Sequence, residues 1–163
     1  MSLGDLFFIF GAKYLYIIVL AIAGLSFLQM KRKKQKELFV LAVVSFPIVL
    51  LVSKIGAYLY FNPRPFVVEH FTPLLAHDPD NGFPSDHTLL LSSVTMLFAI
   101  YQRKISYLLF TLTIVVGFSR IYVGIHHAVD IVGSIFMSVT TVTLSHYIHL
   151  HFKMSKQGEI KKE

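Results

Sequence analysis

Four side chains capable of ionic or acid–base chemistry lie together in residues 117–130, GFSRIYVGIHHAVD, between two long apolar segments. They are Arg120, His126, His127 and Asp130. His126 and Asp130 are four residues apart, so they share one face if they begin a helix. A carboxylate on one imidazole nitrogen fixes the tautomer and leaves the other nitrogen free as a nucleophile or base. His127 is turned by about 100° on such a helix, and we expect it to miss that contact.

Arg120 lies six residues before His126 and would face away from it on one continuous helix. Gly124 stands between the two residues and can open the end of a helix. We therefore expect the chain to turn at Gly124 and bring Arg120 back toward His126.

A second polar segment, GFPSDHT at 82–88, has the features of a helix start. Ser85 follows two turn-forming residues and is well placed as an N-cap. The free backbone N–H groups at such a helix start bind anions. His87 would lie in the first turn, beside any anion bound there.

A third segment, KIGAYLYFNPRPF at 54–66, supplies two cations. Lys54 lies near the end of an apolar run, and Arg64 is held between two prolines that stiffen its loop. Two arginines, a lysine and an open helix start would together form a clamp for phosphate oxygens. With two histidines, one of them paired with a carboxylate, the set suits phosphoryl transfer.

The composition is that of a membrane protein. Of the 163 residues 55% are hydrophobic and 15% are charged, well below the ~25% charged residues of soluble domains. There is no cysteine, which excludes disulfides, thiol nucleophiles and thiolate metal sites. The length suits one domain, 1–163, with a charged tail from about Lys153.

Apolar runs of nearly 20 residues predict an all-α bundle of about five transmembrane helices. We place them at roughly 10–29, 38–60, 86–101, 105–123 and 128–150. Residues 1–9 are either the start of the first helix or a short interfacial piece. The KRKKQK run at 31–36 follows the first apolar run instead of preceding it, so we expect a retained anchor, not a cleaved signal peptide.

The positions of the cations predict the orientation, because cytoplasmic loops collect Lys and Arg. Five helices with the N-terminus outside and the C-terminus in the cytoplasm place 11 of the 15 cations inside. These are Lys31, Arg32, Lys33, Lys34, Lys36, Arg103, Lys104, Lys153, Lys156, Lys161 and Lys162. The net charge of +6 then mainly reflects the cations on the cytoplasmic side of the membrane, and we expect no nucleic-acid partner. The same topology brings the polar segments described above to the outer membrane face.

The three polar segments together resemble the type 2 phosphatidic acid phosphatase family, whose motifs are K-x6-RP, PSGH and SR-x5-H-x3-D. The third motif is complete here, from Ser119 to Asp130. The second is Pro84-Ser85-Asp86-His87, with Asp86 in place of glycine, and we expect Asp86 to point away or pair with a cation. The first keeps Arg64-Pro65, but Ala57 stands where the family has lysine. Lys54, ten residues before Arg64, is the nearest substitute.

The resemblance implies a bundle with an acid phosphatase/vanadium haloperoxidase-like core and a metal-independent reaction without a cofactor. Carried over by position, it makes His126 the nucleophile that forms a phosphohistidine, oriented by Asp130. It makes His87 the acid that protonates the leaving oxygen and later activates water. The implied phosphate ligands are Lys54, Arg64, Ser85 and Arg120.

The PSDH variant, the small size and the outward site resemble the bacitracin-resistance type of undecaprenyl-diphosphatase within this family. The expected substrate is a lipid phosphate, most specifically undecaprenyl diphosphate, which would be hydrolysed to undecaprenyl phosphate. Phosphatidate and phosphatidylglycerophosphate phosphatases use the same machinery and form the first alternative. A non-catalytic carrier or permease for anionic lipids is the second, and an intramembrane hydrolase using Ser85 is the third. The sequence does not indicate an oligomeric state.

Other polar residues have simpler interpretations. His70 and His77 fit ordinary loop residues, and DPDNG at 78–82 fits a turn, since its spacing fails the EF-hand pattern. Three histidines lie near the end of the last apolar run: His146, His149 and His151. No Asp or Glu lies near them to complete a metal site, so we interpret them as an interfacial polar cluster. A purely structural polar network that locks the helices together is the alternative for Arg120, His126 and Asp130.

Overall fold

A computed structural model describes residues 1–160, with side chains to Met154, and this part of the chain is helical throughout except for connecting loops and one isolated β-bridge. The prediction of an all-α fold is confirmed. The helices are α1 (Leu3–Lys13), α2 (Leu15–Leu28), α3 (Arg32–Leu59), α4 (Pro65–Val68), α5 (Asp86–Tyr101), α6 (Arg103–Tyr122) and α7 (Ala128–Ile160).

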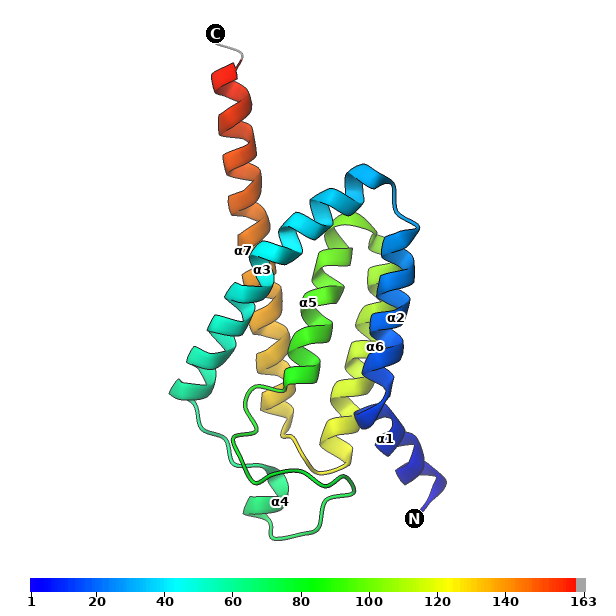
Figure 1. The fold of residues 1–163 in the computed structure, drawn as a ribbon. Coiled ribbons are helices and arrows are strands. Elements are labelled where there is room, and N and C mark those ends of the chain that lie inside the picture. The colour runs from blue at the N-terminus through cyan, green and yellow to red at the C-terminus, as the bar shows by residue number, and fades with distance from the viewer. Residues whose placement is uncertain (161–163) are drawn as a thin grey trace.

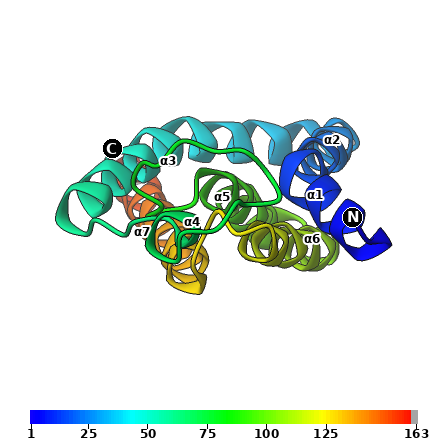
Figure 2. The same cartoon turned by 90° about the horizontal axis from the view of Figure 1, so that it is seen from below.

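Helix α5 forms the centre of the bundle (Figures 1 and 2). It packs against α2, α3, α6 and α7, and its inward side chains, among them Leu89, Leu91 and Phe98, belong to the main hydrophobic core. Small hydroxyl residues allow close packing of α5 on α7: Ser93 Oγ donates to Ser138 Oγ at 3.0 Å. The central position of α5 fixes the residues at its N-terminus relative to all the longer helices.

The five predicted apolar segments correspond to α2, α3, α5, α6 and α7. Helices α3, α6 and α7 are long and apolar enough to cross a membrane, and α1 with α2 forms a fourth candidate span bent by 50°. Helix α5, with 16 residues, is shorter than the ~20 residues of a typical span. The described helices therefore match the predicted count only approximately.

The first residues form a helix of their own, α1, which is separated from α2 by a bend of 50°. Ser2 and Asp5 make a reciprocal capping box that starts this helix. Helical geometry is interrupted at Tyr14, where φ is −125°. At the other end of the chain, the charged tail continues α7 to Ile160, and 161–163 lie outside the described residues.

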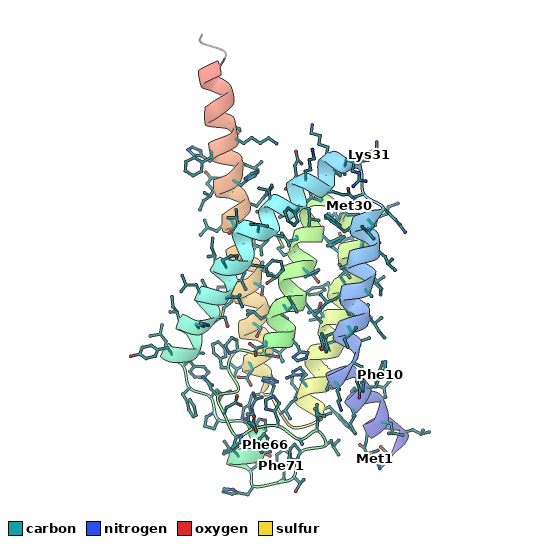
Figure 3. All side chains as sticks on the ribbon, viewed as in Figure 1. Met1, Phe10, Met30, Lys31, Phe66 and Phe71 are labelled. Atoms are coloured by element: carbon teal, nitrogen blue, oxygen red, sulfur yellow. The ribbon has the colours of Figure 1, made fainter. Side chains whose placement is uncertain are left out.

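The two ends of the bundle carry different residues (Figure 3). Met30 and Lys31 lie at one end, and Phe66 and Phe71 lie in the long loop region at the other. At the first end, Lys34 Nζ donates to the Tyr101 carbonyl at 3.3 Å, and Lys153 pairs with Glu37 at 3.2 Å. Lys31, Lys34 and Lys153 thus share one end of the bundle, opposite the long loop.

The connection between α6 and α7 is a Schellman turn. The N–H of Gly124 donates to the Ile121 carbonyl at 3.0 Å, and the N–H of Ile125 donates to the Arg120 carbonyl at 3.2 Å. Gly124 has φ +84°, in the left-handed region. The predicted break at this glycine is confirmed, and it ends α6 just before His126.

We expect Gly124→Ala to lower the unfolding free energy by about 1–2 kcal/mol, because a side chain disfavours the left-handed conformation. A Cβ there would also meet the Phe71 ring at 2.6 Å. Unfolding of the detergent-solubilised protein by denaturant measures the change.

Gly24→Ala is the matched control, since a Cβ at this position in α2 meets nothing within 4 Å. It should be neutral or stabilise by about 0.5–1 kcal/mol. Wild-type stability of the Gly124 variant would contradict the assigned role of the turn.

Candidate active site

His126 and Asp130 form a buried pair at the loop end of the bundle. His126 lies in the loop between α6 and α7 and Asp130 in the first turn of α7, with exposed fractions of 2% and 0%. His126 Nδ1 lies 3.2 Å from Asp130 Oδ2. The predicted contact between these two residues is present.

Two guanidinium groups face the other nitrogen of the His126 ring. Arg120 Nη2 lies 3.2 Å and Arg64 Nη1 3.4 Å from His126 Nε2. A guanidinium can only donate, so Nε2 is the accepting, unprotonated nitrogen, and Nδ1–H donates to Asp130. The surrounding groups therefore fix one neutral tautomer, with its lone pair directed at two cations.

Each arginine is held in place by backbone carbonyls from a distant segment. Arg64, the N-cap of α4, donates from Nη1 to the Ile125 carbonyl at 2.7 Å. Arg120, in the last turn of α6, donates from Nη1 to the Ala12 carbonyl at 3.1 Å. The Nε of Arg120 is buried and has no hydrogen-bond partner within the described part of the chain. A buried donor of this kind is suited to an anion.

Asp130 accepts hydrogen bonds from two further groups that the sequence analysis did not assign. Asn62 Nδ2 donates to Oδ1 at 2.7 Å, and the backbone N–H of His127 donates to Oδ2 at 2.8 Å. The His127 ring contacts the Pro63 carbonyl at 3.1 Å and not the His126–Asp130 pair, as expected. These donors satisfy the carboxylate oxygens and keep the side chain oriented toward His126.

A cavity of about 300 Å³ opens in front of His126. Arg64, Arg120, His87 and Lys54 all line it, so four of the predicted residues meet His126 there. Lys54 therefore reaches the site from α3 despite its shifted position in the sequence. Asp86 also lines the cavity, and it forms no ion pair among the described residues, so the expected pairing with a cation is absent.

Ser85 occupies the predicted N-cap position of α5, but its side chain makes no capping hydrogen bond. The side chain is fully buried, and Ser85 Oγ accepts a hydrogen bond from Thr88 Oγ1 at 3.2 Å. Its backbone N–H lies 3.5 Å from the Asp130 carbonyl, and Ser85 is not part of the cavity lining. A phosphate-binding role for Ser85 remains a prediction.

The loop before α5 contributes residues that the sequence analysis interpreted as a turn or as ordinary loop positions. Asp80 Oδ1 accepts from Arg64 Nε at 2.6 Å, and His77 lines the cavity. Asn81 ties the loop to the end of α3, since its Nδ2 donates to the Ala57 carbonyl at 3.0 Å. The sequence offered one indication of the Asp80–Arg64 pair: the acidic DPDNG segment lies in the same predicted loop as Arg64.

The electrostatics favour a neutral His126 and an ionised Asp80. Burial lowers the pKa of His126; the Asp130 hydrogen bond opposes this shift, and the charges of Arg120 and Arg64 reinforce it. Partial burial alone would raise the pKa of Asp80, but its hydrogen bond and ion pair with Arg64, with His77 nearby, hold it below the usual value. A neutral imidazole with a free Nε2 beside two cations can attack an electrophilic centre bound as an anion.

Comparison with known proteins gives a family match and a fold match. The model of the PAP2 superfamily matches residues 15–153. Among solved structures, LpxE of Aquifex aeolicus has a TM-score of 0.65 and 22% identity, covering 90% of this chain and 87% of that one. A PAP2-type phosphatidylglycerolphosphate phosphatase of Bacillus subtilis has a TM-score of 0.59 and 20% identity, covering 89% and 74%. At these identities the two structures establish the fold alone.

Two curated relatives carry names connected with bacitracin or undecaprenyl diphosphate. The bacitracin transport permease protein BcrC of Bacillus licheniformis is 32% identical over 126 residues, 76% of this chain and 62% of that protein. The undecaprenyl-diphosphatase BcrC of Bacillus subtilis (strain 168) is 41% identical over 92 residues, 55% of this chain and 47% of that protein. The matched regions thus span less than two thirds of either relative.

Removing the Asn62 side chain by Asn62→Ala should lower the unfolding free energy by about 1–3 kcal/mol, because a buried carboxylate oxygen loses its hydrogen bond. Denaturant unfolding in detergent measures this loss. In an Asp130→Asn background the same change should cost clearly less, since the charged acceptor is gone. An equal loss in both backgrounds would show that Asn62 acts elsewhere.

Proposed function

The chain belongs to the PAP2 superfamily, and from this premise we propose that it is a membrane lipid phosphatase that hydrolyses undecaprenyl diphosphate to undecaprenyl phosphate. The observation that carries the proposal is the His126 ring, with Nδ1 on Asp130 and Nε2 facing Arg64 and Arg120 in one cavity.

The first step is attack of His126 Nε2 on the terminal phosphorus. A bond forms between Nε2 and phosphorus, and the bond from phosphorus to the bridging oxygen breaks. The developing imidazolium charge is stabilised by Asp130 through Nδ1–H. Arg64 and Arg120 already lie beside Nε2, so their remaining N–H groups are placed to bind the phosphoryl oxygens as charge accumulates on them. Lys54 supplies a further cation from α3.

In this first step His87 gives its proton to the bridging oxygen of the leaving lipid phosphate as the bond to phosphorus breaks. The second step regenerates the enzyme, and it begins when the now neutral His87 ring takes a proton from water. The resulting hydroxide attacks the phosphohistidine, the bond from phosphorus to Nε2 breaks, and inorganic phosphate leaves. His87 lines the same cavity as His126, as both halves of this cycle require.

The distribution of charge supports a site at the outer membrane face. Lysines 31, 34 and 153 lie at the end of the bundle opposite the cavity. Because cytoplasmic ends collect Lys and Arg, this end is the inner one. Both the N-terminus and the site then face outward, and the C-terminus lies inside.

The substrate class is supported by the names of the relatives. One is called an undecaprenyl-diphosphatase and another a bacitracin transport permease protein. A carrier would need cations for an anionic lipid but no oriented nucleophile. The fixed tautomer of His126 therefore favours a hydrolase over a carrier.

We expect the purified wild-type protein to release phosphate from undecaprenyl diphosphate faster than from phosphatidate or phosphatidylglycerophosphate. His126→Ala should reduce release by about three orders of magnitude or more, because the nucleophile is lost. A phosphate-release assay in mixed micelles measures all three substrates.

Lipid binding by the His126→Ala variant provides the control, since Lys54, Arg64 and Arg120 remain. Binding should persist at near wild-type affinity. Full phosphate release by this variant would refute the mechanism. Faster phosphate release from phosphatidate or phosphatidylglycerophosphate would instead identify the protein as a glycerophospholipid phosphatase.

The pH dependence follows from the lowered pKa of His126. The nucleophile must be neutral, so kcat/KM should fall as the pH decreases through this pKa, below the usual histidine value. Asp130→Asn removes a group that raises the pKa, so the acid limb should move to still lower pH while the rate falls. The substrate titrates identically in both assays, so a difference in the pH of the acid limb between the wild type and Asp130→Asn reports the pKa of His126. An acid limb that moves upward would contradict this assignment.

A further inference from the structure

A second cavity, of about 380 Å³, lies beside the first at the break between α1 and α2. Lys13, Tyr14 and Tyr16 line it from the two helices, and residues 75–77 of the loop line it from the other side. The loop lies across this end of the bundle (Figure 2). It is tied down there because the N–H of Leu74 donates to the Val123 carbonyl at 3.0 Å. The walls of the cavity thus come from two parts of the chain that are far apart in sequence.

The two cavities share part of their lining. His77, His87 and Arg120 line both of them, whereas His126 and Arg64 line only the first and Lys13 only the second. The ring of His87 is positioned by Tyr16, which packs edge-on against it at 4.5 Å between centroids. The proposed general acid therefore stands at the junction of the two spaces.

Phosphoryl transfer requires the attacking and leaving atoms to be roughly in line through phosphorus. A phosphorus held before His126 Nε2 in the first cavity must direct its leaving oxygen away from His126. The acid that protonates this oxygen is His87, at the boundary with the second cavity. The leaving group, which is the part of the substrate still carrying the lipid, then extends into the second cavity.

We propose that the second cavity binds the phosphate that stays on the lipid, and that Lys13 is its cationic ligand. This makes Lys13 a determinant of specificity for lipid diphosphates over lipid monophosphates. The inference rests on the proposed function and deepens it, because a monophosphate substrate places no second phosphate beside Lys13.

The surroundings of Lys13 suit this role. It ends α1, and its Nζ lies 5.2 Å from the centroid of the Tyr14 ring, with no acidic partner within 4.0 Å among the described residues. Tyr14 and Ile17, also in the lining, expose 45% and 52% of their surface. The apolar outer edge gives the lipid chain a route from the cavity toward the bilayer.

A lysine in the last turn of a helix also interacts favourably with the helix dipole, which would be a purely structural role. The experiment must therefore use a measurement that stability alone does not change. The ratio of kcat/KM for undecaprenyl diphosphate to kcat/KM for a lipid monophosphate, phosphatidate, is such a measurement.

Lys13→Gln should lower this ratio by about tenfold, the effect of losing one charge-assisted hydrogen bond to phosphate. Lys13→Arg, which keeps the charge, should restore most of it. Lys104→Gln, an exposed lysine near the start of α6 at the opposite end, is the matched control and should leave the ratio unchanged. Thermal unfolding in detergent verifies that each variant is folded.

The possible outcomes separate this inference from the proposed function. Equal losses on both substrates, or no loss on either, would overturn the role of Lys13 while leaving the phosphatase intact. A ratio that falls with Lys13→Gln and is not restored by Lys13→Arg would also overturn it, since charge would not be the cause. Absence of phosphate release by the wild-type protein from every lipid would instead refute the proposed function itself.

Discussion

The hydrogen bond from His126 Nδ1 to Asp130 is the interaction on which the rest of the site depends. It lies in a place with almost no access to water, where an unpaired carboxylate would be very costly. Asn62, the His127 backbone and the His126 ring together satisfy Asp130, so the charge is tolerated and the ring is held in one tautomer. Without this pair, Nε2 would have no fixed direction and no defined protonation state.

The bundle serves mainly to bring three separate connections to one end. The turn after α6 supplies His126, the loop after α3 supplies Arg64, and the N-terminus of the central helix α5 supplies His87. Backbone carbonyls of Ile125 and Ala12 then orient the two arginines. Arg120 has no carboxylate within 4.0 Å in the described part of the chain, which leaves its charge available to an anionic ligand.

Much of this arrangement could be predicted from local patterns. Apolar periodicity located the helices, the i, i+4 spacing paired His126 with Asp130, and Gly124 indicated the turn that returns Arg120 to the site. Each of these inferences depends on residues close together in the sequence. The break at Tyr14 was not predicted, because Gly11 lies inside α1 and Lys13 is a single charge in an otherwise apolar run that was interpreted as one helix from about residue 10.

The positions that sequence reasoning missed depend on contacts between distant segments. Asn62 and Asp130 form a hydrogen bond although they are 68 positions apart. Asp80 accepts from Arg64 in a loop that Asn81 ties to the end of α3. Asp86 was expected to point away from the anion site or to pair with a cation, but at the start of α5 it lines the cavity without an ion pair among the described residues. Loop conformation of this kind is set by the whole fold and leaves little trace in residue spacing.

The central claim is that His126 carries the phosphoryl group during turnover. It is tested most directly by mixing the protein with undecaprenyl diphosphate labelled in its terminal phosphate, and quenching within one turnover in alkali, which preserves phosphohistidine. Peptide mass spectrometry should find the label on His126 in the wild type, and no labelled residue in His126→Ala. Label on another residue, or turnover by the wild type with no labelled protein, would contradict the account.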